Sequence, residues 1–478
     1  MKNIASALIF FLSLIVYGNE VKKPNVLFIA IDDLNDWTGY LKGNPQAKTP
    51  HLDRLASKGI AFTNAHCTAP ACGPSRASLM SGILPSTSGN YINSSSLTKN
   101  PVLSKAVLLP EFFQKNGYQV LGAGKLYHGA HFILEIQGRG FDEYYPNKKR
   151  DLPPFKKMKL STGKNSYTGI GGGPLPPGST VLDLPDGKTA KWTEEKLLGG
   201  ELKEPFFLAA GIFQPHLPNY APKEYFDRFP LDQIKIPEGY KEDDRNDVPK
   251  ASSKMANNPW LKKIREAGKW KHAIQAYLAC SAMTDDLVGQ IVEALEKSKY
   301  ADNTIVVLWS DHGFQLGEKE LWAKYSLWER ATKVNMIWIA PGVTKAGSVC
   351  SKPVNLLDIY PTLASLTNCT PPKNQLEGND LSGLMKNPEA SWDKNSVTVF
   401  GYKNYGIRSE RYRYIVYEDG SEELYDHQKD NWEWQNLAKN PEYTAIKEKL
   451  RKSTPTHHQK YGPTQKKVPK SFYNQPLK

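Results

Sequence analysis

A cysteine and an arginine one helical turn apart are the residues of this sequence best suited to chemistry. Cys72 opens the run Cys-Gly-Pro-Ser-Arg, which continues through small residues to Gly82. A Pro-Ser pair in this place is typical of a helix N-terminus, where the pKa of a thiol falls and the thiolate is favoured. Cys72 is therefore a candidate nucleophile, with Arg76 beside it. The alternative is a small buried side chain next to a helix cap, which the position alone favours.

Acidic residues directly follow two apolar runs of strand length. The run 25–31 ends at Asp32 and Asp33, and the run 304–309 is followed one residue later by Asp311. Continuous apolar runs suit strands buried on both faces of a parallel sheet, and ligands bind at the carboxyl edge of such sheets. Three carboxylates at one edge repel one another unless a cation neutralises them, and oxygen ligands suit Ca²⁺ or Mg²⁺ better than zinc. Each motif taken singly is as readily a turn or a helix cap.

Strand and helix patterns alternate along most of the chain. Apolar runs of strand length lie at 25–31, 60–62, 119–121, 206–210, 304–309 and 334–340, and helical patterns at 49–56, 109–113, 272–296 and 356–366. This alternation predicts an α/β fold with a large mixed, mostly parallel sheet sandwiched by helices. Residues 143–200 are rich in Lys, Pro and Gly and are expected to form long surface loops. After residue 396, short alternating strands and a helix at 443–451 predict a smaller C-terminal α+β subdomain.

We expect three segments in the chain. Residues 1–18 contain a lysine and a short apolar run, as in a secretory signal peptide, and the run is too short to favour a membrane span. The large α/β domain is expected at 19–395, and an antiparallel-sheet subdomain with a basic tail at 396–478. The sequence therefore predicts a secreted or periplasmic protein with no transmembrane segment.

The net charge indicates the class of partner, and the number of cysteines bears on pairing and modification. The net charge is +13 over 478 residues, with no helix-turn-helix, zinc-finger or RNA-binding motif. For an exported protein this favours polyanionic polysaccharides or membrane surfaces over nucleic acid. The five cysteines are an odd number, so at least one is unpaired or modified. If that one is Cys72, a pair between Cys350 and Cys369 is possible, but the connectivity among these two, Cys67 and Cys280 stays open.

The Cys-x-Pro-Ser-Arg run resembles the signature of the type I sulfatases, a formylglycine-dependent family of the alkaline-phosphatase superfamily. The resemblance covers nearly the whole chain after the signal and includes residues 24–33, 49–56, 122–125, 310–313, 423–426 and 436–437. Segments 214–218 and 322–325 are similar to the iduronate-2-sulfatase branch. The resemblance implies the alkaline-phosphatase-like fold and a sulfuric ester hydrolase activity, with 19–395 as the catalytic domain.

The resemblance also implies a modified nucleophile and a metal. In this family a maturation enzyme converts the cysteine to formylglycine (3-oxoalanine) before folding, and the aldehyde hydrate is the nucleophile. One Ca²⁺ per chain would be held by Asp32, Asp33, the modified Cys72, Asp311 and His312. His312 is the unusual ligand, because Ca²⁺ prefers oxygen, and family precedent alone carries its assignment.

The remaining roles combine the resemblance with the chemistry of sulfate esters. Arg76 would hold the hydrate, and Lys125 and Lys324 would neutralise the sulfuryl oxygens. His128 is the candidate base on the hydrate, and His216 is the candidate acid for the leaving alcohol. These two assignments could be exchanged, because a histidine can serve in either role near neutral pH.

The expected function is hydrolysis of sulfate monoesters on a sulfated carbohydrate, such as an ulvan, a carrageenan or a glycosaminoglycan. One alternative is a phosphodiesterase or phosphonate monoester hydrolase of the same superfamily. A single plausible metal set favours the sulfatase over the two-metal phosphatases of that superfamily. The other alternative is a noncatalytic polyanion-binding protein, which the intact cysteine motif argues against.

Overall fold

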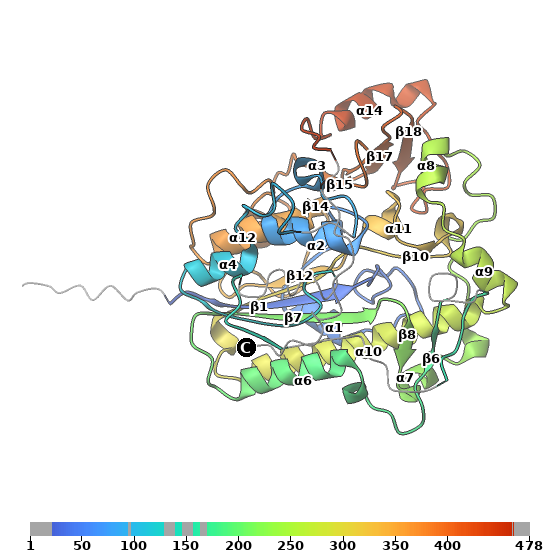
Figure 1. The fold of residues 1–478 in the computed structure, drawn as a ribbon. Coiled ribbons are helices and arrows are strands. Elements are labelled where there is room, and N and C mark those ends of the chain that lie inside the picture. Colours follow the sequence, from blue (N-terminus) through green and yellow to red (C-terminus); the bar gives the residue numbers. More distant parts are fainter. Residues whose placement is uncertain are drawn as a thin grey trace, which may run out of the picture.

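The computed structural model describes residues 22–93, 97–128, 139–145, 156–162, 170–460 and 462. The expected signal peptide and most of the basic tail lie outside the described residues. Figure 1 shows a central sheet between two layers of helices, with a smaller sheet beside one layer.

The central sheet has eight strands in the order β13-β2-β12-β9-β1-β7-β4-β5. Their bounds, in that order, are Ser348–Cys350, Ile60–Phe62, Met336–Ile339, Thr304–Ser310, Asn25–Asp32, Phe206–Pro215, Gln119–Gly124 and Glu143–Tyr145. β12 runs antiparallel to both of its neighbours, whereas the other neighbouring pairs are parallel. The predicted mixed, mostly parallel sheet is confirmed.

Helices cover both faces of this sheet. On one face lie α1 (Pro50–Lys58), α6 (Pro185–Leu198) and α10 (Trp270–Lys297), and on the other α2 (Cys72–Ser81), α4 (Leu109–Lys115) and α12 (Ile359–Leu366). Alternate residues of β1 enter the two cores: Leu27, Ile29 and Ile31 face one, and Val26, Phe28 and Ala30 face the other. Burial of both faces explains why this strand is a continuous apolar run.

The loop prediction for residues 143–200 is wrong in part. Residues 185–198 form α6, which packs against α10 and β7 and buries Ala190, Trp192 and Leu197. The many lysines and glycines of the region hide the helical spacing of these apolar residues. Residues 146–155 and 163–169 lie outside the described part of the chain.

The C-terminal sheet is a four-stranded antiparallel meander, and the predicted small antiparallel subdomain is confirmed. Its strands are β15 (Ser396–Val399), β16 (Tyr405–Arg408), β17 (Tyr412–Val416) and β18 (Glu422–Asp426), and α14 (Thr444–Arg451) packs beside it. The fourth strand was not expected as a strand. The expected boundaries after residues 18 and 395 stay predictions.

Shorter elements connect these layers. The short strands and helices are β3 (Ala65–His66), α3 (Pro85–Ser88), β6 (Gly172–Pro174), β8 (Asn219–Ala221), α7 (Lys223–Asp227), α8 (Lys250–Met255), α9 (Trp260–Glu266), β10 (Gln315–Leu316), β11 (Trp322–Ala323), α11 (Glu329–Thr332), β14 (Val354–Asn355) and α13 (Ser382–Lys386). The 3-10 turns are Val181–Asp183, Leu231–Gln233, Ala301–Asn303, Glu318–Glu320, Leu356–Asp358 and Pro441–Tyr443. Over the described residues, no helix is both long and apolar enough to cross a membrane.

All five cysteines are buried free thiols. The possible pair between Cys350 and Cys369 is therefore wrong for this structure. The two sulfurs point to different backbone carbonyls, that of Pro388 for Cys350 and that of Thr367 for Cys369.

Candidate active site

The ends of two neighbouring parallel strands bring the predicted carboxylates together. β1 and β9 pair in register up to Ile31 and Ser310, so that Asp32, Asp33 and Asp311 emerge at one edge of the sheet. The backbone N–H of Asp33 donates to Asp311 Oδ1 at 3.1 Å. Asp33 has a φ of 60°, a left-handed backbone that turns the chain at this point. The sequence-based expectation that these strands are neighbours is confirmed.

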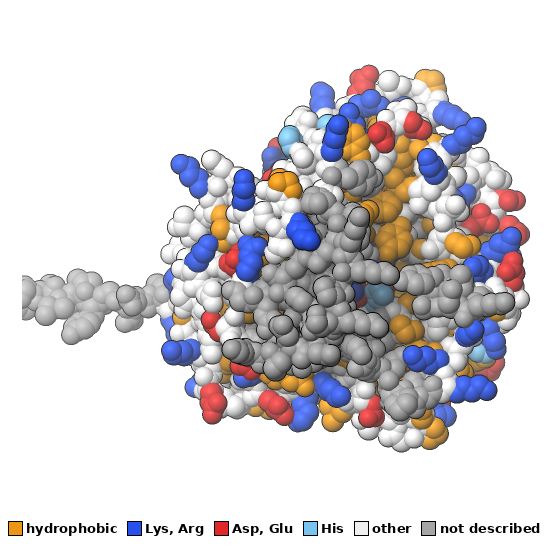
Figure 2. All heavy atoms as spheres, in the orientation of Figure 1, with side chains coloured by type: hydrophobic (Ala, Val, Ile, Leu, Met, Phe, Trp, Pro, Cys, Tyr) orange, Lys and Arg blue, Asp and Glu red, His pale blue; other side chains and the backbone are white. Residues whose placement is uncertain are grey.

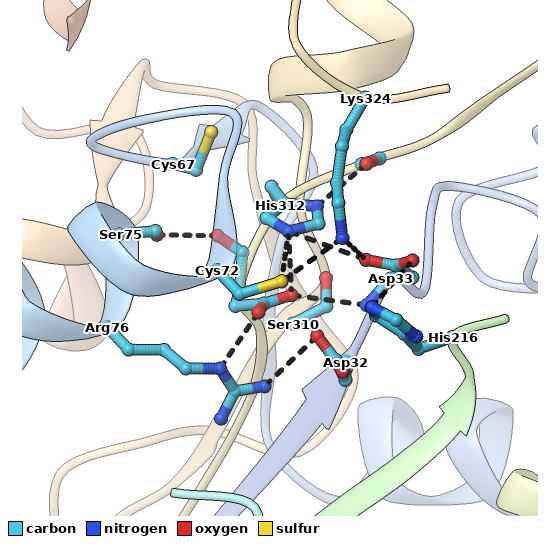
Figure 3. Close-up of polar contacts among 12 residues, drawn as sticks. Asp32, Asp33, Cys67, Cys72, Ser75, Arg76, His216, Ser310, His312 and Lys324 are labelled. Carbon is cyan, nitrogen blue, oxygen red and sulfur yellow. Dashed lines mark hydrogen bonds and ion pairs between the residues drawn. The ribbon is translucent and has the colours of Figure 1, made fainter. Parts of the chain in front are cut away.

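Helix α2 points its N-terminus at this edge and delivers Cys72 there (Figure 3). Every residue of α2 is buried. Ser75 Oγ donates to the backbone oxygen of Asp311 at 2.6 Å, and the N–H of Gly73 donates to Asn93 Oδ1 at 2.8 Å. The first bond holds α2 against the end of β9, and the second ties the start of α2 to Asn93.

The thiol of Cys72 lies between a lysine and a histidine. Its Sγ is 3.1 Å from Lys324 Nζ and 3.3 Å from His312 Nε2. Burial and the Asp32 carboxylate raise the pKa of the thiol, but Lys125 and Lys324 outweigh them, so its pKa lies below the ordinary value. The position is electropositive, as a nucleophile requires.

Arg76 is fully buried and bridges the two strand ends. Its Nε lies 2.8 Å from Asp311 Oδ2, and its Nη2 lies 3.6 Å from Asp32 Oδ1. Its Nη1 donates to the backbone oxygen of Lys125 at 2.5 Å, which ties α2 to the end of β4. The guanidinium therefore fixes the carboxylates and the Lys125 segment in one place.

Two lysines reach the carboxylates from different parts of the chain. Lys125, after β4, pairs with Asp32, and Lys324, after β11, lies 2.6 Å from Asp33 Oδ1. Burial works against a charged Asp32, but the neighbouring cations, Lys125 first, hold its pKa well below the usual range. Burial raises the pKa of Asp33 to about 6 although Lys324 opposes the rise.

The three histidines of the prediction differ in their surroundings. His216 Nε2 lies 3.9 Å from Asp33 Oδ2, and its Nδ1 donates to the backbone oxygen of Leu217 at 2.6 Å. His216 keeps 27% of its side chain exposed, as a group that meets substrate needs. Burial lowers the pKa of His312, but Asp311 outweighs it and the pKa rises to about 9. Burial and the charges of Lys125 and Lys324 lower the pKa of His128 to about 3, so it stays neutral.

The ligand atoms at this edge fit a cation. Two groups of ligand atoms, each within 4.8 Å of one another, are formed by Asp32, Cys72, Asp311 and His312 and by Asp32, Asp33, Cys72 and His216. Among the described residues, Asp32 Oδ1 is buried and accepts no hydrogen bond. A carboxylate-rich set with such an oxygen suits Ca²⁺. The predicted ligands are brought together, and His216 joins them, which the sequence did not suggest.

Two residues of this site were missed at the sequence level. Asn93 accepts from Gly73 N–H, and its Nδ2 donates to Tyr325 Oη at 3.3 Å. Tyr325 has a φ of 67° and its N–H donates to the backbone oxygen of Pro70 at 3.2 Å. Neither role leaves a local signal, because each contact joins segments far apart in the chain.

Comparisons with known proteins assign the family. The Sulfatase family model matches residues 24–369, and the model of the N-sulphoglucosamine sulphohydrolase C-terminal region matches 317–460. The chain belongs to the sulfatase family and is a sulfuric ester hydrolase. The predicted resemblance and fold class are confirmed.

Three curated relatives align over most of this chain. A sulfatase of Formosa agariphila is 40% identical over 91% of this chain and 87% of its own length. An ulvan-active sulfatase of the same organism is 28% identical over 90% and 80%. The iduronate 2-sulfatase of Mus musculus is 28% identical over 82% and 84%.

Solved structures share the fold across two reaction types. A 2-O GAG sulfatase has a TM-score of 0.70 and 24% identity, with 90% of this chain and 91% of that chain covered. The phosphonate monoester hydrolase of Agrobacterium radiobacter has a TM-score of 0.72 and 19% identity, with 90% and 94% covered. The fold alone therefore does not separate sulfate from phosphonate esters.

Proposed function

We propose that this sulfatase removes sulfate from a sulfated carbohydrate, with Cys72 as the precursor of its nucleophile. The observation that carries this proposal is the place of Cys72 Sγ, 3.1 Å from one lysine and in one ligand cluster with Asp32, Asp311 and His312. Cations around an oxygen nucleophile are what an anionic ester requires, because both the substrate and the transition state carry negative charge.

The proposal includes a modified residue and a metal. Cys72 would be converted to formylglycine by a maturation enzyme, and the hydrated aldehyde would supply an oxygen nucleophile. Ca²⁺ would be held by Asp32, Asp33, Asp311 and His312 together with that side chain, and would supply positive charge beside the sulfate.

The chain's own cations bind and orient the ester. Arg76 holds the nucleophilic side chain from the side of α2. Its own position is fixed by its ion pair with Asp311 and by its hydrogen bond to the backbone oxygen of Lys125. Lys125 and Lys324 contact carboxylates from opposite segments, and their ammonium groups are the donors for the sulfuryl oxygens.

The two histidines divide the proton transfers. His216 is partly exposed and lies beside Asp33, and this supports its role as the acid that protonates the leaving alcohol. His128 is held neutral by its surroundings, as a proton acceptor must be before it acts, and we assign it the base role at the hydrate. A pKa of about 3 makes it a weak base, so its substitution is expected to cost less activity than that of His216.

The substrate class follows from the relatives and the charge of the chain. Relatives include proteins named ulvan-active sulfatase and iduronate 2-sulfatase, both of which refer to uronate-containing sulfated sugars. The net charge of +13 suits such polyanions. We propose a 2-sulfated uronic acid or a related sulfated sugar of ulvan or glycosaminoglycan type, and an exported enzyme released by cleavage near residue 18.

A mass measurement tests the nucleophile. In a host that carries the maturation enzyme, the peptide containing Cys72 should lose about 18 Da relative to the unmodified thiol. Full alkylation of Cys72 in active protein would contradict the proposal. Protein made without that enzyme should fold and be nearly inactive.

A substrate panel tests the reaction. Sulfate release is measured on ulvan and heparan oligosaccharides, and hydrolysis on p-nitrophenyl sulfate and bis-p-nitrophenyl phosphate. We expect turnover of sulfate esters. Turnover of the phosphodiester alone would favour the phosphonate monoester hydrolase alternative, with which the fold is shared.

A further inference from the structure

A groove of about 660 Å³ lies between α8 and the C-terminal sheet, outside the site described above. Its floor is apolar, formed by Tyr91, Ile92, Met255 and Phe400. Figure 2 shows hydrophobic side chains gathered in a band on this face, running from the C-terminal sheet toward the middle of the molecule. The volume is in the range of ligand-binding clefts.

The groove adjoins the nucleophile through two chains of contacts. On one side, the ring of Phe400 stacks on Tyr325 with centroids 6.0 Å apart, and Tyr325 follows Lys324, whose Nζ is 3.1 Å from Cys72 Sγ. On the other side, Ile92 precedes Asn93, which bonds both Gly73 and Tyr325. One layer of side chains therefore separates the groove from the reacting centre.

The rim carries opposite charges on its two sides. Lys250 and Lys254 are exposed on α8, and in the described part of the chain neither forms an ion pair. Glu418 and Asp419 line the groove from the turn before β18. A lysine pair binds sulfate or carboxylate groups, carboxylates accept hydrogen bonds from hydroxyls, and an aromatic floor packs against the apolar face of a pyranose ring. An anionic sugar presents all three features together, and the sulfated carbohydrate of the proposed function is built of such units.

We propose that this groove binds a sugar residue next to the one that carries the cleaved sulfate, so that the substrate is an oligosaccharide that extends over the C-terminal sheet. This inference rests on the proposed carbohydrate function. The sulfated sugar lies at Cys72, and its neighbour in the chain lies on Phe400 with its anionic group toward Lys250 and Lys254.

Binding to a non-hydrolysing variant tests the groove. In a Cys72→Ala background, the affinity of a sulfated monosaccharide unit of ulvan, which cannot reach the groove, and of an ulvan hexasaccharide is measured by calorimetry. We expect the hexasaccharide to bind at least tenfold more tightly. The double variant Lys250→Glu/Lys254→Glu should lose that gain and leave the monosaccharide affinity within twofold.

A matched control separates the groove from bulk charge. Lys223→Glu/Lys297→Glu makes the same change in net charge on two other helices, where both lysines are largely exposed. Equal losses in the two double variants, or a hexasaccharide that binds no more tightly than the monosaccharide, would overturn the proposal.

Turnover separates failure of the groove from failure of the proposed function. With Cys72 intact, the groove double variant should hydrolyse p-nitrophenyl sulfate at the wild-type rate and lose about tenfold in kcat/KM on the hexasaccharide. If no sulfated sugar releases sulfate while the length-dependent binding persists, the reaction proposal fails and the groove proposal stands. A loss on both substrates would contradict a separate groove.

Discussion

Two buried clusters of charge meet in the chain between Lys324 and Glu329, and they differ in how their charges are used. The site cluster is formed by Asp32, Asp33, Cys72, Arg76, Lys125, Asp311, His312 and Lys324. The junction cluster is formed by Glu329, Arg408, Arg413, His427 and Glu433, where α11 meets the C-terminal sheet.

The junction cluster binds its own charges and the backbone around them. Arg413 pairs with both Glu329 and Glu433, and its Nη1 donates to the backbone oxygen of Leu327 at 3.0 Å. The N–H of Glu329 donates to Glu433 Oε2 at 2.8 Å. Burial opposes charge on both glutamates, but their basic neighbours hold both pKa values below the ordinary range.

The carboxylates of the site cluster are compensated less completely than the two glutamates of the junction cluster. Asp32 Oδ1 accepts no hydrogen bond within the described residues, and the pKa of Asp33 is raised to about 6 although a lysine lies beside it. The contrast teaches that burial of charge serves two ends in one molecule. At the junction the ion pairs hold α11 and the C-terminal sheet together. At the site they hold charged side chains in place for the binding of a further ion.

The largest effect should come from the nucleophile. Cys72→Ala should lower kcat by about 10⁴-fold or more, because in the proposed reaction the attacking oxygen comes from the modified Cys72 side chain. The free energy of unfolding should stay near the wild-type value, since the thiol bonds only to groups of the site. Steady-state kinetics and urea unfolding of the same preparation check both. Residual activity within tenfold of wild type would contradict the assignment.

The next effect should fall on stability alone. Arg413→Met should lower the free energy of unfolding by about 3–5 kcal/mol, because it removes the one cation that pairs with both Glu329 and Glu433 at the junction. Activity per folded molecule should fall far less than in Cys72→Ala. Lys352→Met, which removes an exposed pair with Glu410, is the control and should matter little. Equal effects of the two changes in urea unfolding would show that the junction cluster is not structural.

Added Ca²⁺ should stabilise the protein through the site cluster and not through the junction cluster, by a smaller amount than Arg413→Met destabilises it. Adding Ca²⁺ at about 100 times its Kd to chelator-treated protein should raise the free energy of unfolding by about 2.7 kcal/mol. Asp311→Asn should abolish this increase, and Arg413→Met should keep it, because the junction holds its own cations. Thermal unfolding with and without Ca²⁺ measures the increase, and its absence in the wild type would contradict a Ca²⁺ site.

The smallest effect concerns pH. A glutamate with a lowered folded-state pKa stabilises the fold above its unfolded pKa, about 4.3, and this contribution is lost as the pH falls through the folded value. In Arg413→Met the glutamates stay buried with one cation fewer, so they take up protons at a higher pH than in the wild type. The stability difference between wild type and Arg413→Met should therefore be largest near neutral pH and narrow as the pH falls. The change should reach at most about 1.4 kcal/mol per pH unit for each glutamate. Urea unfolding at several pH values checks this, and a difference that widens in acid would refute the sign.

Much of the fold could be predicted because its signals are local. The apolar run of β1 and the helical spacing of α10 are visible in short windows, and both elements form as expected. Helix α6 could not be predicted from composition, because its burial depends on α10 and β7. The strand β18 depends in the same way on its pairing with β17.

The sequence by itself determined the nucleophile motif, the carboxylates at two strand ends and the order of the sheet-forming runs. These are properties of neighbouring residues, which the covalent chain fixes. Only the tertiary structure decided which lysine meets which carboxylate, that Asn93 supports Cys72, and that His216 lies among the candidate metal ligands. It also decided that a groove lies between α8 and the C-terminal sheet. Those contacts join groups up to about 300 residues apart, and their charges gain strength only when folding removes water from around them.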